Sequence, residues 1–148
     1  MMGQRMNENL NRLEGVIRLL EHIKYEIGEL MTPQNEIFIR FGNEALEKCG
    51  FLEILKKCRA DGEGSLLEKA LDVYGKSFLD DQRCDMMLRD FASSLGKLSR
   101  EAQVERCTAY ITRFGEIYAA KNGKTAGDVK LCRSMGILIG AASVIILL

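Results

Sequence analysis

The residues of this chain that could perform acid–base or metal chemistry are few and scattered. The sequence holds a single histidine, His22, and acidic residues stand close together at Glu26 and Glu29 and at Asp80 and Asp81. General acid–base catalysis needs a positioned group with a tuned pKa. The acidic pairs are expected at helix caps or on solvated faces, and His22 on the flank of an amphipathic helix as a partly solvated side chain. We therefore expect no catalytic residues.

Cysteine chemistry is also disfavoured by spacing. The five cysteines are widely separated and form no CxxC pair: Cys49, Cys58, Cys84, Cys107 and Cys132. Zinc sites normally need close pairs of Cys or His ligands. The glycines at 42, 62 and 64 follow no known phosphate-binding order. The sequence thus predicts reduced thiols, no metal, no cofactor and no enzymatic activity.

The C-terminal residues 135–148 (MGILIGAASVIILL) carry no charge and directly follow a basic stretch at 130–133. Such an apolar segment must meet lipid or another apolar surface. At about 1.5 Å per residue it extends roughly 21 Å as a helix, which is shorter than a bilayer core of about 30 Å. A membrane-directed segment is the favoured interpretation, and a buried C-terminal core helix is the alternative.

Two features of the tail bear on its setting. Basic residues outnumber acidic ones between positions 113 and 133, which is typical of a cytoplasmic flank and favours anionic lipid. Gly136 and Gly140 have the spacing that lets two membrane helices approach closely. They could pack against a partner helix or a second copy of the chain, or simply reflect the frequency of glycine in membrane helices.

Composition predicts one ordinary folded domain before that tail. The 148 residues are 47% hydrophobic and 28% charged, which suffices for a core. Because 21 basic residues balance 21 acidic ones, the basic surface of a nucleic-acid-binding protein is not expected. We expect a cytoplasmic helical bundle over residues 1–129 and a basic flank with a hydrophobic membrane segment over 130–148.

Apolar periodicity predicts an all-α bundle. Apolar residues recur every three or four positions from 7 to 31, which predicts a long first helix. Thr32 and Pro33 are expected to end it and begin another in a tight hairpin. Residues 36–59 are interrupted by Gly42 and Gly50 and predict either two short helices or a bent one.

The second half predicts further helices from their caps. Ser65 and Glu68 form a capping-box pattern, and Asp80 and Asp81 precede a helix that is expected to close at Gly96. A final helix is expected from residue 99 and could continue into the tail. Its seam is predicted at Val104, Cys107, Ile111, Phe114 and Tyr118.

Two stretches, SLGKLSREAQ at 94–103 and KLCRSMGILIG at 130–140, carry a family resemblance. The chain resembles stage III sporulation protein AB of endospore-forming bacteria, a family similar to the cytoplasmic helical domain of the type II secretion inner-membrane platform protein F. The family pattern falls on Leu95, Gly96, Arg100 and Gln103, with Ser99 in place of an acid. A second pattern falls on Arg133, Ser134, Met135 and Gly136.

The resemblance implies a membrane-associated scaffold of the channel complex that joins mother cell and forespore. It implies a sporulation ATPase and membrane or ring-forming proteins as partners, at the cytoplasmic face of the mother-cell membrane around the forespore. Family members open with a spanning helix, whereas this chain opens with polar residues, so either an anchor is missing or the tail alone holds the membrane. The rival hypothesis is a tail-anchored adaptor or regulator unrelated to channel assembly.

The residues of the first pattern have both structural and functional interpretations. Gly96 is expected to end a helix, or else to permit close approach of a partner. Arg100 and Gln103 share a helix face and could bind a partner's carboxylate or backbone. A local salt bridge with Glu101, or a contact to the preceding helix, is the structural alternative.

Overall fold

The computed structural model describes residues 2–59, 64–75, 79 and 81–122 of the chain. In these residues the secondary structure is entirely helical, which confirms the predicted all-α class for the described part. The elements in order are α1 (Met2–Gly28), the 3-10 helix η1 (Gln34–Glu36), α2 (Glu44–Lys48), α3 (Phe51–Lys57), α4 (Leu66–Tyr74), α5 (Gln82–Ser94) and α6 (Arg100–Asn122).

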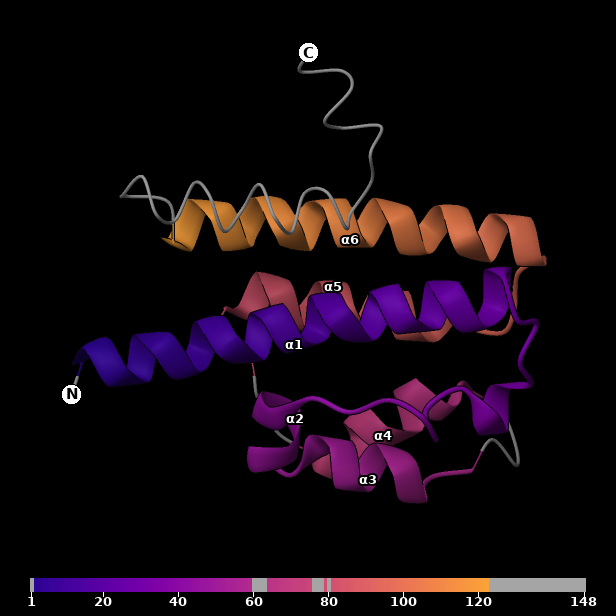
Figure 1. Ribbon diagram of the computed structural model, residues 1–148, viewed down its shortest axis with the longest axis horizontal. Helices are drawn as coiled ribbons and strands as arrows, with labels where there is room; N and C mark the ends of the chain where they lie inside the picture. Colours follow the sequence, from indigo (N-terminus) through magenta and orange to yellow (C-terminus); the bar gives the residue numbers. More distant parts are fainter. Residues whose placement is uncertain (1, 60–63, 76–78, 80, 123–148) are drawn as a thin grey trace, which may run out of the picture.

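Helices α1 and α6 form a long antiparallel pair, and Figure 1 shows them side by side. On its other side α1 packs against the short α2. Helix α5 contacts both α6 and α4. The short helices α2, α3 and α4 gather on the side of α1 that is away from α6 (Figure 1). This arrangement brings the C-terminal end of α1 next to the beginning of α6.

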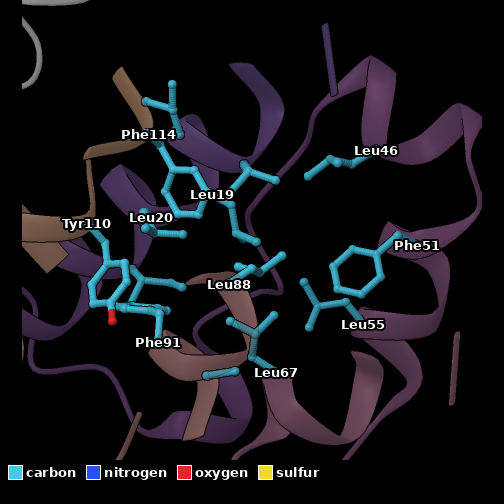
Figure 2. Packing of buried hydrophobic residues seen from close by; sticks show 14 of the residues in the cluster. Leu19, Leu20, Leu46, Phe51, Leu55, Leu67, Leu88, Phe91, Tyr110 and Phe114 are labelled. Carbon is cyan, nitrogen blue, oxygen red and sulfur yellow. The ribbon is translucent and has the colours of Figure 1, made fainter. Parts of the chain in front are cut away.

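The core lies between the long pair and the short helices. Figure 2 shows Leu19 and Phe114 of the long helices and Leu88 of α5 converging with Phe51 of α3. The predicted seam of α6 is confirmed, because its members from Cys107 onward are buried and Val104 is half-buried. The α1 stripe is buried from Leu10 to Ile23, but Leu30 is exposed because the helix has already ended.

The connection after α1 differs from the predicted tight helical hairpin. The helix ends at Gly28 rather than at 31, and Met31 has a positive φ of 53°. Thr32 does not cap a helix: the residue before the 3-10 turn is Pro33, where no side-chain cap hydrogen bond forms, and the Thr32 hydroxyl instead donates to Glu26 Oε1 at 2.6 Å. After Pro33 the chain forms one 3-10 turn and then turns without a helix up to α2. Side-chain contacts thus replace the expected second helix.

Residues 44–57 form two short helices, which was one of the two predicted alternatives. Gly50 separates α2 from α3 with a φ of 89°, a conformation that an L-residue rarely adopts. Asn43 caps α2 by accepting from the Leu46 amide at 3.1 Å. A Cβ on Gly15 of α1 would lie 2.6 Å from Asn43 Oδ1, so this glycine lets α1 approach the cap closely.

Two of the predicted caps are present. Ser65 and Glu68 form the reciprocal capping box of α4, and Asp81 caps α5 by accepting from the Arg83 amide at 2.8 Å. The Ser65 hydroxyl also donates to the carbonyl of Ala92 at 2.6 Å, which joins the start of α4 to α5. Asp80, the other predicted cap, lies outside the described residues.

Candidate functional site

The turn between α5 and α6 is built around Gly96. Leu95 has φ −64° and ψ 125°, Gly96 has φ 85°, and the Lys97 amide donates to the Ser94 carbonyl at 3.1 Å. These angles and this hydrogen bond define a type II turn, whose third position requires a positive φ and therefore favours glycine. Gly96 thus follows the end of α5, as predicted, and its conformation explains its residue type.

Ser99 begins α6, as expected for the residue that replaces the family's acid. Its hydroxyl accepts a hydrogen bond from the Ala102 amide at 3.2 Å, and its carbonyl accepts from the Gln103 amide at 2.8 Å. A serine oxygen therefore satisfies one of the free amides at the helix start. Ser99 fixes where α6 begins relative to the turn.

Arg100 and Gln103 tie the start of α6 to its surroundings. Arg100 Nη1 donates to the carbonyl of Gly28, the last residue of α1, at 3.0 Å, and Arg100 also pairs with Glu101 at 3.6 Å. Gln103 Oε1 accepts from the Gly96 amide at 3.1 Å. These are the structural contacts that the sequence left as an alternative to partner binding.

A pocket of about 350 Å³ opens where the end of α1 meets this turn. Its walls combine the two segments with the 3-10 region. The lining residues are Ile27, Met31, Thr32, Gln34, Ile37, Leu95, Gly96, Leu98, Arg100 and Gln103. The four residues expected to bind a partner therefore lie together in one pocket.

The four predicted residues differ in exposure. Leu95 and Gln103 are each 2% exposed, so they support the pocket from behind. Gly96 and Arg100 are exposed, as is the intervening Leu98. Gly96, Leu98 and Arg100, rather than Leu95 or Gln103, form the surface that a partner would meet first. Their role in partner binding stays a prediction.

The opposite wall of the pocket could not be foreseen from the sequence. Met31, Gln34 and Ile37 belong to a segment more than fifty positions upstream of Gly96. Gln34 Oε1 accepts from the Leu66 amide at 3.0 Å, which holds this segment against the start of α4. No local pattern in the sequence signals such a contact.

Glu26 corrects one expectation, because it lies in the interior rather than at a cap or on a solvated face. It is 2% exposed and accepts hydrogen bonds from Thr32 Oγ1 at 2.6 Å and from Arg40 Nη2 at 2.8 and 3.0 Å. Burial favours the neutral acid, but the bonds from Thr32 and Arg40 outweigh it and hold the pKa of Glu26 below its ordinary value. Its neighbour Glu29 is exposed, as expected.

The hydrogen-bonded cluster of Glu26, Thr32 and Arg40 holds one wall of the pocket. Thr32, which Glu26 binds, lines the pocket directly. His22, one turn before Glu26 on α1, donates through Nε2 to the carbonyl of Ile37, another lining residue, at 2.6 Å. His22 is half-buried, in agreement with the sequence-based expectation. These polar groups therefore position the connection between α1 and α2.

The thiols of the described core are poorly suited to nucleophilic chemistry. Burial raises the pKa of Cys107 to about 12, and burial together with the Asp81 charge raises that of Cys84 to about 11. Both groups are therefore neutral thiols at physiological pH. Over the described ranges, no cluster of three or more His, Cys, Asp or Glu side chains is arranged to hold a metal ion.

The four residues predicted to pack in a membrane segment, Arg133, Ser134, Gly136 and Gly140, lie outside the described residues. The same holds for Cys132 and for the domain boundary expected near residue 129. Within the part of the chain that the structure describes, no helix combines the length and the apolar character needed to cross a membrane. The membrane segment therefore stays a prediction.

The fold and the pocket define an all-helical bundle protein with an apolar surface pocket at one end. A family model for stage III sporulation protein AB matches residues 1–148, and the chain belongs to this family. The family expected from the two sequence stretches is therefore confirmed. No curated protein and no solved structure matches the chain.

Proposed function

We propose that this protein is a membrane-associated scaffold of the channel complex between mother cell and forespore. The observation that carries the proposal is the family match over residues 1–148, which assigns the chain to stage III of sporulation. The helical architecture and the buried, neutral thiols Cys84 and Cys107 support a role in assembly rather than catalysis. The protein has no enzymatic activity of its own in this proposal.

The proposed mechanism is docking through the pocket end of the bundle. Gln103 fastens the α5–α6 turn through its bond from the Gly96 amide and Leu95 is buried beneath it, while Leu98 and Arg100 present an apolar and a cationic group at the surface. Arginine is enriched among the residues that anchor protein interfaces, and the buried centre of an interface is more apolar than its rim. A sporulation ATPase is the proposed partner at this surface, by analogy with the secretion platform proteins.

The second half of the proposal concerns the membrane. Residues 135–148 would associate with lipid at the cytoplasmic face of the mother-cell membrane, behind the basic flank at 130–133. Arg133, Ser134, Gly136 and Gly140 would pack against membrane or ring proteins of the complex, or against a second copy of the chain. What supports this is the charge-free sequence of the tail and its basic flank.

Co-purification tests the docking mechanism. The full chain with an affinity tag is expressed with the sporulation ATPase, and separately with an unrelated cytoplasmic ATPase. Selective recovery of the sporulation ATPase is expected, with recovery lost on Leu98→Asp and kept on Val73→Asp. Val73 is a matched control because it is 65% exposed and lies on α4, away from the pocket. Equal recovery of both ATPases would favour the adaptor hypothesis.

A further inference from the structure

The pocket continues outward as apolar surface. Its lining includes two exposed apolar side chains, Met31, which is 67% exposed, and Leu98, which is 41% exposed. Its volume of about 350 Å³ lies at the small end of the usual range for ligand pockets, about 300–1,000 Å³. A pocket of this size whose rim is itself apolar suits a side chain that projects from a larger apolar surface.

Hydrogen-bond donors mark the floor and rim of the pocket. Gln103 is 2% exposed, its Oε1 is occupied by the Gly96 amide, and its Nε2 is buried with no hydrogen-bond partner among the described residues. An unpaired buried donor costs about 1–3 kcal/mol, so an acceptor that reached it would be favoured. The residue that lines the pocket thus carries an unpaired donor that is covered in the empty pocket.

Arg100 supplies charge beside that amide. Among the described residues that line the pocket, it is the one with a formal charge. Its guanidinium binds the Gly28 carbonyl through Nη1 and lies 3.6 Å from the exposed Glu101 carboxylate through Nη2, and with five N–H donors it has further capacity. Arg100 and Gln103 stand three positions apart on α6 and therefore share a face.

The apolar walls of the pocket and the N–H donors of Arg100 and Gln103 indicate which class of ligand could bind there. A lipid surface would call for a cluster of basic side chains, whereas one guanidinium lines this pocket. A carboxylate paired with Arg100 and Gln103 would satisfy both donors. An amphipathic helix can present a large apolar side chain and a carboxylate one turn apart on the same face. Met31 at the rim is an adaptable contact for such a helix.

We propose that this pocket receives one large apolar side chain from an amphipathic helix of a partner protein, whose carboxylate one turn away binds Arg100 and Gln103. This inference rests on the proposed docking function and adds the chemistry of the partner. It predicts that an acidic, apolar helix is bound in preference to a neutral one of the same shape.

Peptide titration tests this chemistry without the natural partner. The full chain is reconstituted in phosphatidylcholine nanodiscs and titrated with a fluorescent alanine-based helix that carries one leucine and, four positions later, one glutamate. Fluorescence anisotropy is compared with two control peptides, in which glutamine replaces the glutamate or alanine replaces the leucine. The Leu/Glu helix is expected to bind saturably and about tenfold more tightly than either control, with no binding to empty nanodiscs.

Variants of the chain assign the binding to the pocket. Leu98→Asp is expected to abolish it and Val73→Asp to leave it unchanged. Arg100→Ala should weaken binding of the glutamate peptide to the level of the glutamine peptide, while the glutamine peptide is hardly affected. Because Arg100→Ala also loses the bond to Gly28, the unfolding midpoint of each variant is measured alongside.

The outcomes distinguish failure of this inference from failure of the proposed function. Equal affinity for the three peptides, or unchanged binding to Leu98→Asp, contradicts the assigned chemistry. Self-association that is abolished by Leu98→Asp, in a chain that binds no peptide, would assign the pocket to a second copy.

If the peptides do not bind while the sporulation ATPase still co-purifies, the docking function stands and the pocket assignment falls. If the Leu/Glu peptide binds as expected but the ATPase does not co-purify, the pocket chemistry stands and the proposed partner falls.

Discussion

At the scale of single residues, Gly96 and Glu26 shape the two walls of the pocket. Gly96 sits in the left-handed region at φ 85°, and a Cβ there would lie 3.3 Å from Gln34 Nε2. Glu26 holds Thr32 and Arg40 from inside the bundle. The requirement for glycine at position 96 follows from local backbone geometry and was predicted, whereas the burial of Glu26 was not.

Replacing Gly96 by alanine should destabilise the turn. We expect Gly96→Ala to lower the free energy of unfolding by about 1–2 kcal/mol, because an L-residue in the left-handed region costs about this much. Urea unfolding followed by circular dichroism measures the change. Gly42→Ala is the matched control, since Gly42 is exposed and a Cβ there would meet nothing closer than Glu47 Oε1 at 4.0 Å. An equal effect at both glycines would contradict the explanation.

Glu26 should make stability depend on pH. Its folded-state pKa is lowered from 4.5, so its ionised form stabilises the protein above that value, and the contribution is lost as the pH falls through the lowered pKa. We expect Glu26→Gln to cost about 2 kcal/mol at pH 7, as for hydrogen bonds to a charged group. The difference from the unmodified chain should shrink as the pH falls below 4.5, the ordinary pKa of a glutamate.

Urea unfolding at a series of pH values measures this difference. Glu29→Gln provides the comparison, because Glu29 is exposed on the same turn of the chain. A cost for Glu26→Gln that stays constant down to pH 3 would show that the charge of Glu26 is not what stabilises the fold.

At the scale of elements, the start of α6 depends on one hydroxyl. Ser99→Ala removes the acceptor for the Ala102 amide and should cost about 1 kcal/mol, the usual value for an N-cap serine. Ser93→Ala should be close to neutral, because the Ser93 hydroxyl donates to the Asp90 carbonyl inside α5 and caps no free amide. Thermal unfolding of the two variants compares them directly. If they destabilise alike, Ser99 does not act as a cap.

The elements that were predicted correctly are those specified by local patterns. The capping box at Ser65 and Glu68, the break at Gly50 and the buried seam of α6 all depend on residues within a few positions of one another. The prediction of a helix directly after Thr32 was wrong: the Thr32 hydroxyl donates to Glu26, six positions earlier, and only a 3-10 turn follows Pro33. Contacts between segments that are distant in the sequence cannot be predicted from the pattern of neighbouring residues.

The candidate site also has one part that the sequence predicted and one part that it did not. Its α5–α6 half was identified from the family pattern, and the structure brings Leu95, Gly96, Arg100 and Gln103 together. Its other half comes from the end of α1 and the 3-10 turn, and the bond from Arg100 to the Gly28 carbonyl spans 72 positions. Only the antiparallel packing of α1 on α6 makes these segments neighbours.

At the scale of the whole molecule, the proposal joins a helical bundle to a membrane. The pocket lies where α1 finishes and α6 begins. Figure 1 shows these two helix ends next to each other. The chain leaves α6 after Asn122, at the other end of the long pair. Docking and membrane attachment are therefore assigned to different parts of the chain and can be tested separately.

Membrane fractionation of sporulating cells tests the central claim most directly. The full chain is compared with a chain that ends at Ser134, both detected through the same N-terminal tag. The full chain is expected in the membrane fraction, resistant to high salt and released by detergent, and the shortened chain in the soluble fraction. A full chain that stays soluble, or a shortened chain that still sediments with the membrane, would contradict the claim that residues 135–148 attach this scaffold to lipid.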